Sequence, residues 1–473
     1  MTTNRKPIGL IIAAASLPAF MATLDNLVVT NALPVMQKSL GASIEDLQWF
    51  INAYSLSFAS FILMAVALGD RFGRKRVFTA GIALFAAASA ACAVSTSPEM
   101  LIAARAVQGI GGAAIMPLSL ALIAGAVPRA SRAMAIGIWG GVAGLGVALG
   151  PLIGGAVVEG LSWHAIFWLN IPVALVAIPL ALWALPESFG KRVRLDLVGL
   201  ALAALGVFGI VFGIVRGNDA GWTSAQVLTG LVGGSVLIVA FLLWEQRTTD
   251  PLLPLALFRD RSFSAANGVG ITFSIGILGA VFILIQFLQV VQGKTPLQAG
   301  AMTMPWTMAP LVVAPIAGLI APRVGTRLLI VMGTTLQALG LGWIALALEP
   351  TVAYSQLVGP FLLCGIGMGL VFAPIATAVL ANMRDEDHAK ASGTNATLRE
   401  IGVALGIAIL TAVFTGAGGT FTPTGYTDAA IPAIWTGVAF LVLASAIGLF
   451  LPAGKGVPDA DRAPELDAVL AAV

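Results

Sequence analysis

The sequence predicts an all-α protein that crosses a membrane many times, and three observations support this prediction. Hydrophobic residues make up 58% of the 473 residues, charged residues only 10%, and the mean hydropathy is +0.97. Soluble globular domains carry about 25% charged residues, so the composition excludes that class. Apolar runs long enough to cross a bilayer recur along the whole chain. The 54 glycines agree, because small residues let membrane helices approach closely.

We expect fourteen spanning helices, each an apolar run between polar or turn-forming residues. The first run is too long for the core of a signal peptide, so we expect it to stay in the mature chain. An even number of spans places both termini on one side of the membrane. The expected spans are 10–33, 46–69, 77–95, 99–126, 132–157, 164–186, 196–215, 224–244, 263–291, 298–320, 328–348, 355–380, 392–414 and 430–452.

The distribution of basic residues supports this topology. With the N-terminus inside, 20 of the 25 lysines and arginines lie in the inner segments, and the outer loops keep only Lys38, Arg216 and Lys294. Such an excess on one side is the positive-inside signal of cytoplasmic loops. The remaining two, Arg105 and Arg399, lie within spans. A missed helix would invert every later loop, so the asymmetry also supports the span count.

Polar stretches divide the spans into a 6+2+6 plan. We expect a six-helix bundle over 1–188, a two-helix insertion over 189–250, a second six-helix bundle over 251–452 and a cytoplasmic tail over 453–473. The turn VALGDRFGRKR (66–76) after the second span is similar to GLIAPRVGTR (318–327) after the tenth. Repeated halves are the usual build of secondary transporters, whose substrate site lies near the midplane between them.

Asp25 is the strongest candidate for a functional residue. It lies in the middle of the first apolar run, and a carboxylate at membrane depth costs several kcal/mol, so such residues are usually functional. The alternative is that Asp25 only orients its helix by pairing with a neighbour. Arg105 lies about a third of the way into the fourth span and therefore at a similar depth.

Several motifs resemble those of one family. The chain carries, in order, LDNLVVTNALP (24–34), LGDRFGRKR (68–76), LIAARAVQGIGGA (101–113), GVALGPLIGG (146–155), LDLVG (195–199), NDAGW (218–222), LQVVQGKTPLQAG (288–300) and SGTNATLREIGVALG (392–406). Their order and spacing are similar to those of the fourteen-span drug/proton antiporters of the major facilitator superfamily. The resemblance covers nearly the whole chain and implies the major facilitator fold.

The resemblance implies a role for the turn after the second span. Asp70, Arg71, Gly73 and Arg74 match the loop motif that, in this superfamily, latches the two halves together on the cytoplasmic side. Gly73 would permit the tight turn, and Asp70 would interact with the nearby arginines. The alternative is a plain basic anchor at the membrane surface.

The resemblance also implies that the first and fourth helices line the central cavity, so that Asp25 and Arg105 can interact. Burial favours the neutral acid and a nearby arginine favours the carboxylate, and that competition suits a group that binds and releases a coupling proton. Gln108 belongs to the same motif. A static buried pair is the alternative.

The fifth span carries a smooth face of Gly146, Gly150 and Gly154, spaced four residues apart, and Pro151, which removes a backbone donor. The resemblance implies that this face meets the opposite half and prevents a leak. Ordinary helix packing is the alternative.

A second acid, Glu400, lies in the thirteenth span beside Arg399. Sequence neighbours point about 100° apart on a helix, so we expect that the two charges do not simply neutralise one another. We take Glu400 as the second candidate for a proton or cation carrier. The alternative is that either side chain extends to the nearby membrane interface. Relatives that export dications often carry an acid where this chain has Asn52, which favours monocationic, neutral or zwitterionic cargo. The expected substrate contacts are Asn26, Asn31, Asn52, Gln108, Gln286, Gln289, Asn395, Arg399, Trp306 and Phe372.

We therefore expect a proton-coupled antiporter of the bacterial inner membrane that exports small amphiphilic or cationic compounds and works as a monomer, with both termini cytoplasmic. Protons would be the coupling ion, with no cofactor, metal, enzymatic activity or nucleic-acid partner. The chain has no GxxxxGK[ST] motif, and we expect no disulfide between Cys92 and Cys364. The open alternatives are a proton-coupled importer or exchanger of a specific metabolite on the same fold, a membrane sensor without transport, and a membrane-embedded enzyme.

Overall fold

The structure is a computed structural model that describes residues 7–190, 195–249, 251–383 and 388–453. The described residues form helices and turns without a strand, and fourteen of the helices are long and apolar enough to cross a membrane. The predicted fold class, an all-α protein with fourteen spans, is therefore confirmed. The expected basic loop around 191–194 and the tail from 454 onwards lie outside the described residues.

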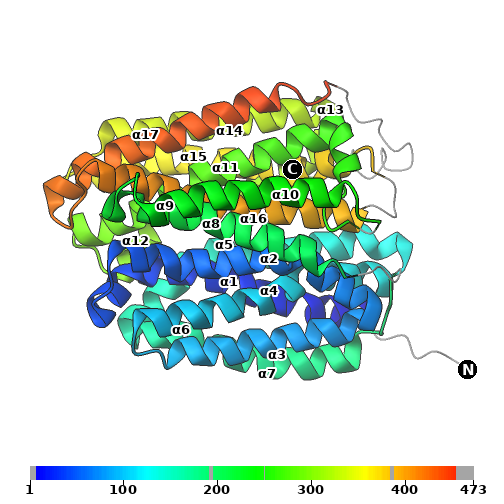
Figure 1. Ribbon diagram of the computed structural model, residues 1–473. Helices are drawn as coiled ribbons and strands as arrows, with labels where there is room; N and C mark the ends of the chain where they lie inside the picture. Colours follow the sequence, from blue (N-terminus) through cyan, green and yellow to red (C-terminus); the bar gives the residue numbers. More distant parts are fainter. Residues whose placement is uncertain (1–6, 191–194, 250, 384–387, 454–473) are drawn as a thin grey trace, which may run out of the picture.

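The first half contains six spans, of which the sixth is interrupted. Figure 1 shows this half in blue and cyan. The sixth span breaks at Leu169, and Asn170 begins its second segment, where the sequence predicts one continuous helix. The elements are α1 (Ile8–Leu40), α2 (Ile44–Phe72), α3 (Arg74–Ala93), α4 (Pro98–Ala126), α5 (Arg129–Gly160), α6 (Trp163–Trp168) and α7 (Asn170–Ala184).

The insertion is a hairpin that lies across the seam between the halves (Figure 1). Glycines bring its two arms together: a Cβ on Gly209 would lie 3.0 Å from the carbonyl oxygen of Gly230, and Gly206 and Gly234 face each other in the same way. Its elements are α8 (Leu197–Ala220), α9 (Ala225–Leu228), the π-helical turn η1 (Thr229–Gly233) and α10 (Gly234–Glu245). α8 packs against α2 of the first half and α16 of the second.

The second half also contains six spans, and it has two local breaks. The ninth span ends in a π-helical turn, and the tenth begins with a separate short helix, α12. The elements are η2 (Leu255–Arg259), α11 (Arg261–Gln286), η3 (Phe287–Val291), α12 (Pro296–Met302), α13 (Met304–Val324), α14 (Thr326–Ala347), α15 (Tyr354–Leu380), α16 (His388–Gly416) and α17 (Pro423–Gly448).

The two similar turns adopt the same backbone conformation. Gly73 joins α2 to α3 with φ 110°, and Gly325 joins α13 to α14 with φ 87°. Each glycine donates its N–H to the carbonyl four residues earlier at 2.9 Å. A side chain rarely adopts positive φ, so the turn requires glycine at both positions. The internal repeat read from the sequence therefore has a structural counterpart.

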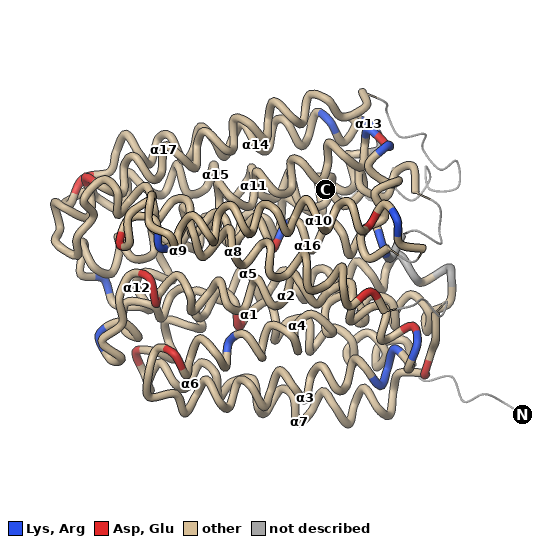
Figure 2. Tube along the Cα trace, in the orientation of Figure 1, with Lys and Arg blue, Asp and Glu red and all other residues tan. Residues whose placement is uncertain are grey.

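Charge distinguishes the two ends of the bundle. Figure 2 shows most lysines and arginines at the right-hand end, which we call the basic end. It contains Arg71, Arg74, Lys75 and the α13–α14 turn. The opposite end contains α12 and the C-terminal ends of α1, α5, α8 and α16.

The halves are closed at the opposite end. Asn31 of α1 donates to the carbonyl oxygens of Pro151 (2.8 Å) and Pro296 (2.9 Å), which joins α1, α5 and α12. Gly155 packs directly against the backbone of Pro296 and Leu297, so that a Cβ there would clash. These contacts leave no gap between α5 and α12.

Towards the basic end, α5 and α13 separate. Thr307 of α13 donates to the carbonyl of Ala148 at 3.1 Å, and a Cβ on Gly144 would still meet Leu311 at 3.5 Å. About two turns further along the same register, Gly137 and Gly318 would face each other, but neither has a neighbouring atom within 4 Å of its Cβ position. The structure is therefore closed at the opposite end and open between α5 and α13 at the basic end.

Candidate functional site

The centre of the candidate site is a buried ion pair between α1 and α4. Arg105 Nη1 lies 2.5 Å from Asp25 Oδ2, and the side chains are only 0% and 1% exposed. The structure thus joins the two residues that the sequence placed at one depth. A close, buried and charge-assisted hydrogen bond of this kind is strong, and removing one partner would leave an unpaired charge.

The other carboxylate oxygen of Asp25 accepts two amide hydrogen bonds. Gln108 Nε2 donates to Oδ1 at 3.0 Å, and Asn170 Nδ2 donates to the same oxygen at 2.7 Å. Asn170 begins α7, immediately after the break in the sixth span. Three donors from two helices therefore surround the carboxylate, which has the arrangement that suits an anion.

Arg105 is held by more than its partner acid. Its Nε donates to the carbonyl of Phe50 at 3.0 Å, and its guanidinium stacks 4.4 Å from the ring centre of Tyr54 on α2. Nη1 also donates to Gln108 Oε1 at 2.7 Å. Nη2 has no hydrogen-bond partner, although it is buried. The plane of the guanidinium is fixed from three sides, with one donor left unused.

Sequence reasoning missed three members of this network: Tyr54, Ser89 and Asn170. Ser89 of α3 accepts hydrogen bonds from Asn170 (2.8 Å) and Gln108 (3.3 Å). The available signal was a polar residue inside an apolar run, which Asn170 satisfies two residues before Pro172. Such residues also occur as ordinary packing contacts, so the signal could not single out Asn170.

The second acid, Glu400 of α16, is also buried, at 9% exposed. Arg399 Nη2 lies 3.9 Å from its Oε1, while Oε2 has no partner. We expected the two neighbours to point apart. Instead the long arginine side chain turns back towards the acid, although the distance exceeds that of a hydrogen bond. Glu400 therefore keeps one unpaired oxygen in the interior.

A strip of unpaired polar side chains on α2 extends over two helical turns and reaches the level of Glu400 at Ser55. Neither amide atom of Asn52 has a partner, nor has Gln48 Oε1 or Ser55 Oγ. These residues share one face of α2 because they are three or four positions apart. Gly393 contacts Leu63, and Trp49 and Leu56 cluster with Ala404 and Ala408. These contacts align α2 antiparallel to α16. In this alignment, Glu400 of α16 lies level with residues 55 and 56 of α2.

Three of the expected substrate contacts form hydrogen bonds between helices or within one helix. Gln289 donates to the backbone oxygen (2.8 Å) and Oδ1 (2.9 Å) of Asn31, so both belong to the closed opposite end. Gln289 lies in the π-helical turn η3, a feature common at functional sites. Gln286 donates to Phe282 of its own helix at 3.2 Å.

Three other expected contacts gather near the second acid, between α11, α15 and α16. Asn395 donates to Asn267 Oδ1 at 3.1 Å. The Arg399 guanidinium lies 5.8 Å from the ring centre of Phe372, which packs edge-on against Phe273.

The last two lie apart from this group. The Trp306 indole is 3% exposed, packs beside Phe361 and leaves its N–H unpaired. Asn26 is half-buried next to Asp25.

The turn at the basic end forms a compact charged cluster. Asp70 Oδ1 pairs with Arg74 Nη2 at 2.7 Å, and Gly190 donates its N–H to the carbonyl of Asp70. A Cβ on Gly73 would lie 2.7 Å from the Glu187 carboxyl carbon. The Arg71 guanidinium lies 5.4 Å from the ring centre of Phe72. These partners belong to the first half, except Gly190 at the start of the insertion, and the expected latch to the second half stays a prediction.

The glycine face of α5 has a different partner from the one expected. A Cβ on Gly150 would lie 2.8 Å from Leu27, and one on Gly154 would lie 2.9 Å from Val28. Gly146 likewise packs against Thr23 and Phe20. All these partners lie on α1 of the same half, so in this conformation the three glycines pack within their own half, while Pro151 contacts Gly300 of the second half. The expected contact of the three glycines with the opposite half stays a prediction. The residues of α5 that meet the second half include Gly144, Ala148, Pro151, Leu152 and Gly155.

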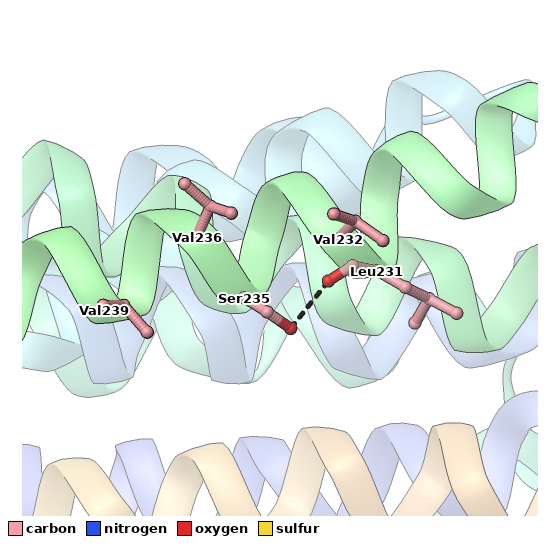
Figure 3. A pocket seen from close by; sticks show the side chains of 5 residues that line it. All are labelled: Leu231, Val232, Ser235, Val236 and Val239. Atoms are coloured by element: carbon pink, nitrogen blue, oxygen red, sulfur yellow. Dashed lines mark hydrogen bonds between the residues drawn. The ribbon is translucent and has the colours of Figure 1, made fainter.

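Two surface hollows lie away from the buried network. Figure 3 shows one on η1 and α10, lined by Leu231, Val232, Ser235, Val236 and Val239. Its one hydroxyl, that of Ser235, donates to the carbonyl of Leu231 at 2.7 Å. The hollow therefore offers a ligand only apolar contacts. The second lies between α8 and α16 and includes Asn218 and Trp222. Among the described residues, no three His, Cys, Asp or Glu side chains group as metal ligands.

Comparison with known proteins identifies the relatives of this chain. The family model described as the Major Facilitator Superfamily matches residues 15–407. The chain is 36% identical to the multidrug resistance protein Stp of Mycobacterium tuberculosis (strain CDC 1551 / Oshkosh), over 85% of this chain and 75% of that protein. It is 32% identical to the tetracenomycin C resistance and export protein of Streptomyces glaucescens (94% and 83%) and 31% identical to the methylenomycin A resistance protein of Bacillus subtilis (strain 168) (98% of each).

Solved structures share the fold at low sequence identity. The human organic anion transporter MFSD10 (TETRAN) has a TM-score of 0.64 at 17% identity, over 93% of this chain and 99% of that one. A POT family transporter in complex with 5-aminolevulinic acid has a TM-score of 0.67 at 15% identity, over 92% and 94%.

Proposed function

This chain belongs to the major facilitator superfamily, and we propose that it exports small amphiphilic or cationic compounds across a bacterial membrane in exchange for protons. Its relatives are named as multidrug resistance, antibiotic resistance and export proteins, which supports efflux. The basic end faces the cytoplasm by the positive-inside rule, and the chain is a multi-pass protein of the cytoplasmic membrane that works as a monomer.

The observation that supports proton coupling best is the buried Asp25 carboxylate with three donors. These three donors suit the carboxylate form of Asp25, and we assign this conformation to the stage of the cycle that follows proton release. The open gap between α5 and α13 faces the cytoplasm. Conversion to the alternate state would close this gap, open the opposite end and let Asp25 take a proton from outside.

The membrane potential can drive such a cycle. A proton that moves inward gains about 2.3 kcal/mol per 100 mV, which sustains roughly a fortyfold gradient of a neutral cargo. Cargo would bind between the halves beside the unpaired strip on α2 and Glu400, where buried polar atoms lack partners. Glu400 is the second proton or cation carrier in this proposal.

Substrate-driven proton movement tests the proposal. The first step is a susceptibility panel of toxic cations, dyes and antibiotics in a host that lacks its own exporters. In everted vesicles, a compound exported by wild type should release protons from the energised interior. Asp25→Asn should lose this response but still exchange labelled compound across the membrane. A full response in Asp25→Asn would exclude Asp25 as the proton carrier.

The same vesicles separate the alternative functions. A proton-coupled importer on the same fold would move its substrate in the same direction as the proton, and an exchanger would move labelled metabolite only against unlabelled metabolite. A sensor without transport would show no counterflow of labelled compound in proteoliposomes.

A further inference from the structure

The donors around Asp25 are oriented by a second layer of hydrogen bonds. Ser89 donates its proton to the carbonyl of Phe167 at 2.9 Å, so its oxygen is left to accept. It accepts from Asn170 at 2.8 Å, which turns the Asn170 amide group towards Asp25 as a donor. Arg105 donates to Gln108 Oε1 and in this way turns the NH₂ of Gln108 towards Asp25.

Both amides are therefore fixed as donors, and a protonated Asp25 would present its own hydrogen to groups that cannot accept it. A carboxylate is the form that satisfies all three donors. Asn170 differs from Arg105 and Gln108 because it comes from a separate helix and stands at the break between α6 and α7. It is 2% exposed, so water does not replace it.

We propose that Asn170, held by Ser89, is a positioning residue that keeps Asp25 charged in this conformation and so sets the pH at which the exporter binds its coupling proton. This inference rests on the proposed function. The other titratable groups near Asp25 are Arg105 on α4, Tyr54 on α2 and Cys92 on α3, with Glu400 of α16 beyond Tyr54. None of these differs between the variants that test the proposal.

Infrared titration of the purified full-length protein in lipid nanodiscs tests this without a substrate. The protonated-carboxyl band that disappears in Asp25→Asn belongs to Asp25. In Asn170→Ala its half-maximal pH should rise by about one unit, because a hydrogen bond to a charged group is lost. Asn170→Asp keeps nearly the same side-chain shape but adds a second negative charge beside Asp25. It should raise the half-maximal pH of the Asp25 band further than Asn170→Ala does.

Ser119→Ala is the matched control. Ser119 is buried in the same half and accepts a hydrogen bond from Trp139 at 3.0 Å, outside the network. In Ser119→Ala, the Asp25 band should have the same half-maximal pH as in wild type. If folded Asn170→Ala and Asn170→Asp both titrate like wild type, the proposal is overturned. A wild type without substrate-driven proton movement would instead overturn the proposed function.

A second observation concerns the insertion, which holds both halves at the opposite end. On one side, Arg216 Nε of α8 lies 3.0 Å from Glu45 of α2. On the other, Asn218 donates to the carbonyl of Ala412 (2.6 Å) and to Thr415 Oγ1 (2.7 Å) of α16. Trp222 donates to Asn218 Oδ1 at 2.9 Å and so orients its amide.

The same part of α8 is wedged between the halves by apolar contacts. Val211 and Val215 are buried in one cluster with Trp49 and Leu56 of α2 and Ala404 and Ala408 of α16. If the opposite end opens during transport, α2 and α16 must separate here, and one side of this bridge must break. We infer that α8 is a bridge that favours the closed opposite end. This inference also rests on the proposed function, because it requires alternating access.

Spin labels report the opening directly. Lys38 and Glu349 are exposed residues of the first and second half at this end, and the native Cys92 and Cys364 are buried. In a Lys38→Cys/Glu349→Cys pair, Asn218→Ala should increase the long-distance population by about fivefold or more, because its hydrogen bonds to α16 are lost. Arg216→Gln should act in the same direction and more weakly, since the ion pair is partly exposed.

Ser235→Ala removes a hydrogen bond within α10 and should leave the distances unchanged. The proposal requires that the wild type opens when the pH is lowered. If it does, and folded Asn218→Ala and Arg216→Gln both show wild-type distances, the bridge is overturned. A wild type that never opens would contradict alternating access itself.

Discussion

At the scale of single residues, the network around Asp25 depends on direction as well as charge. Arg105 uses Nε for a backbone carbonyl, Nη1 for Asp25 and its flat face for the Tyr54 ring. A lysine carries the same charge but has one nitrogen and no planar face. The residue type at position 105 is therefore specified by three contacts that only arginine can make together.

Arg105→Lys should consequently lower transport even though it preserves the charge. The lost bond to Phe50 and the lost stacking each contribute roughly 1 kcal/mol, so we expect at least a tenfold reduction in efflux rate. Dye efflux from cells with matched protein levels measures this. Lys75→Arg, a charge-preserving exchange at the exposed turn, should have no comparable effect. Wild-type efflux in Arg105→Lys would mean that charge alone suffices.

Asn52 bears on the charge of the cargo. Both of its amide atoms are buried without a partner about one helical turn from the level of Glu400. Asn52→Asp would place a second acid at this level, and two acids can balance a cation with two charges. We expect the variant to increase resistance to dicationic biocides relative to monocationic ones, as measured by minimal inhibitory concentrations. Asn382→Asp, a partner of Asp260 at the surface, serves as the control. An unchanged ratio would place Asn52 outside the cargo site.

At the scale of helices, α5 has three different surfaces along its length. Gly146, Gly150 and Gly154 pack against α1, Gly155 packs against α12, and Gly137 and Gly141 touch nothing within 4 Å of the Cβ position. Small residues on one face of α5 therefore pack within the first half. A small residue on another face allows the close contact with the second half at the opposite end. The open glycines lie where the helix separates from α13.

Gly155→Ala should interfere with closure of the opposite end. Its methyl group would overlap the backbone of Pro296 and Leu297, which cannot move like a side chain. Overpacking of this kind costs about 1–3 kcal/mol, so we expect a lower melting temperature and reduced efflux. Gly141→Ala changes the same helix by the same methyl group in open space and should behave like wild type. Equal behaviour of the two variants would contradict the tight contact between α5 and α12.

At the scale of the whole molecule, the two ends differ in the distance between the halves. The opposite end is joined by Asn31, Gln289 and the α5–α12 contact, while α5 and α13 diverge at the basic end. Alternating access requires that the basic end can also close. The register of α5 on α13 predicts that Gly137 and Gly318 would then face each other.

A disulfide tests this closure. In Gly137→Cys/Gly318→Cys, oxidation during active transport should form a crosslink on the basic side, and the crosslinked protein should lose efflux until a reductant is added. To measure the crosslink, the chain is cleaved between its two halves, and the fragments are separated on a non-reducing gel. The fragments run together at full length only where the disulfide has formed. Each single cysteine variant should keep its activity under oxidation. Full transport by a completely crosslinked protein would exclude this motion.

Much of the fold could be predicted because a bilayer restricts the choice. Backbone groups in the membrane must bond within their own helix, so every span needs a long apolar run, and hydropathy counts these runs. The depth of Asp25 and Arg105 also followed from residue number and topology alone. The interruptions at Leu169 and at α12 did not, since a short break leaves the average hydropathy of a run unchanged.

The sequence by itself determined the fourteen spans, the repeated turn at Gly73 and Gly325, and the depth at which the buried acid meets an arginine, because these depend on local composition and on distance along a helix. Only the tertiary structure decided that Asn170 and Ser89 complete the shell around Asp25, that the glycine face of α5 packs on α1, and that α8 joins both halves. These contacts depend on how each helix is rotated about its axis and which neighbour it meets. Periodicity in one helix carries no information about that choice when most of its faces are apolar.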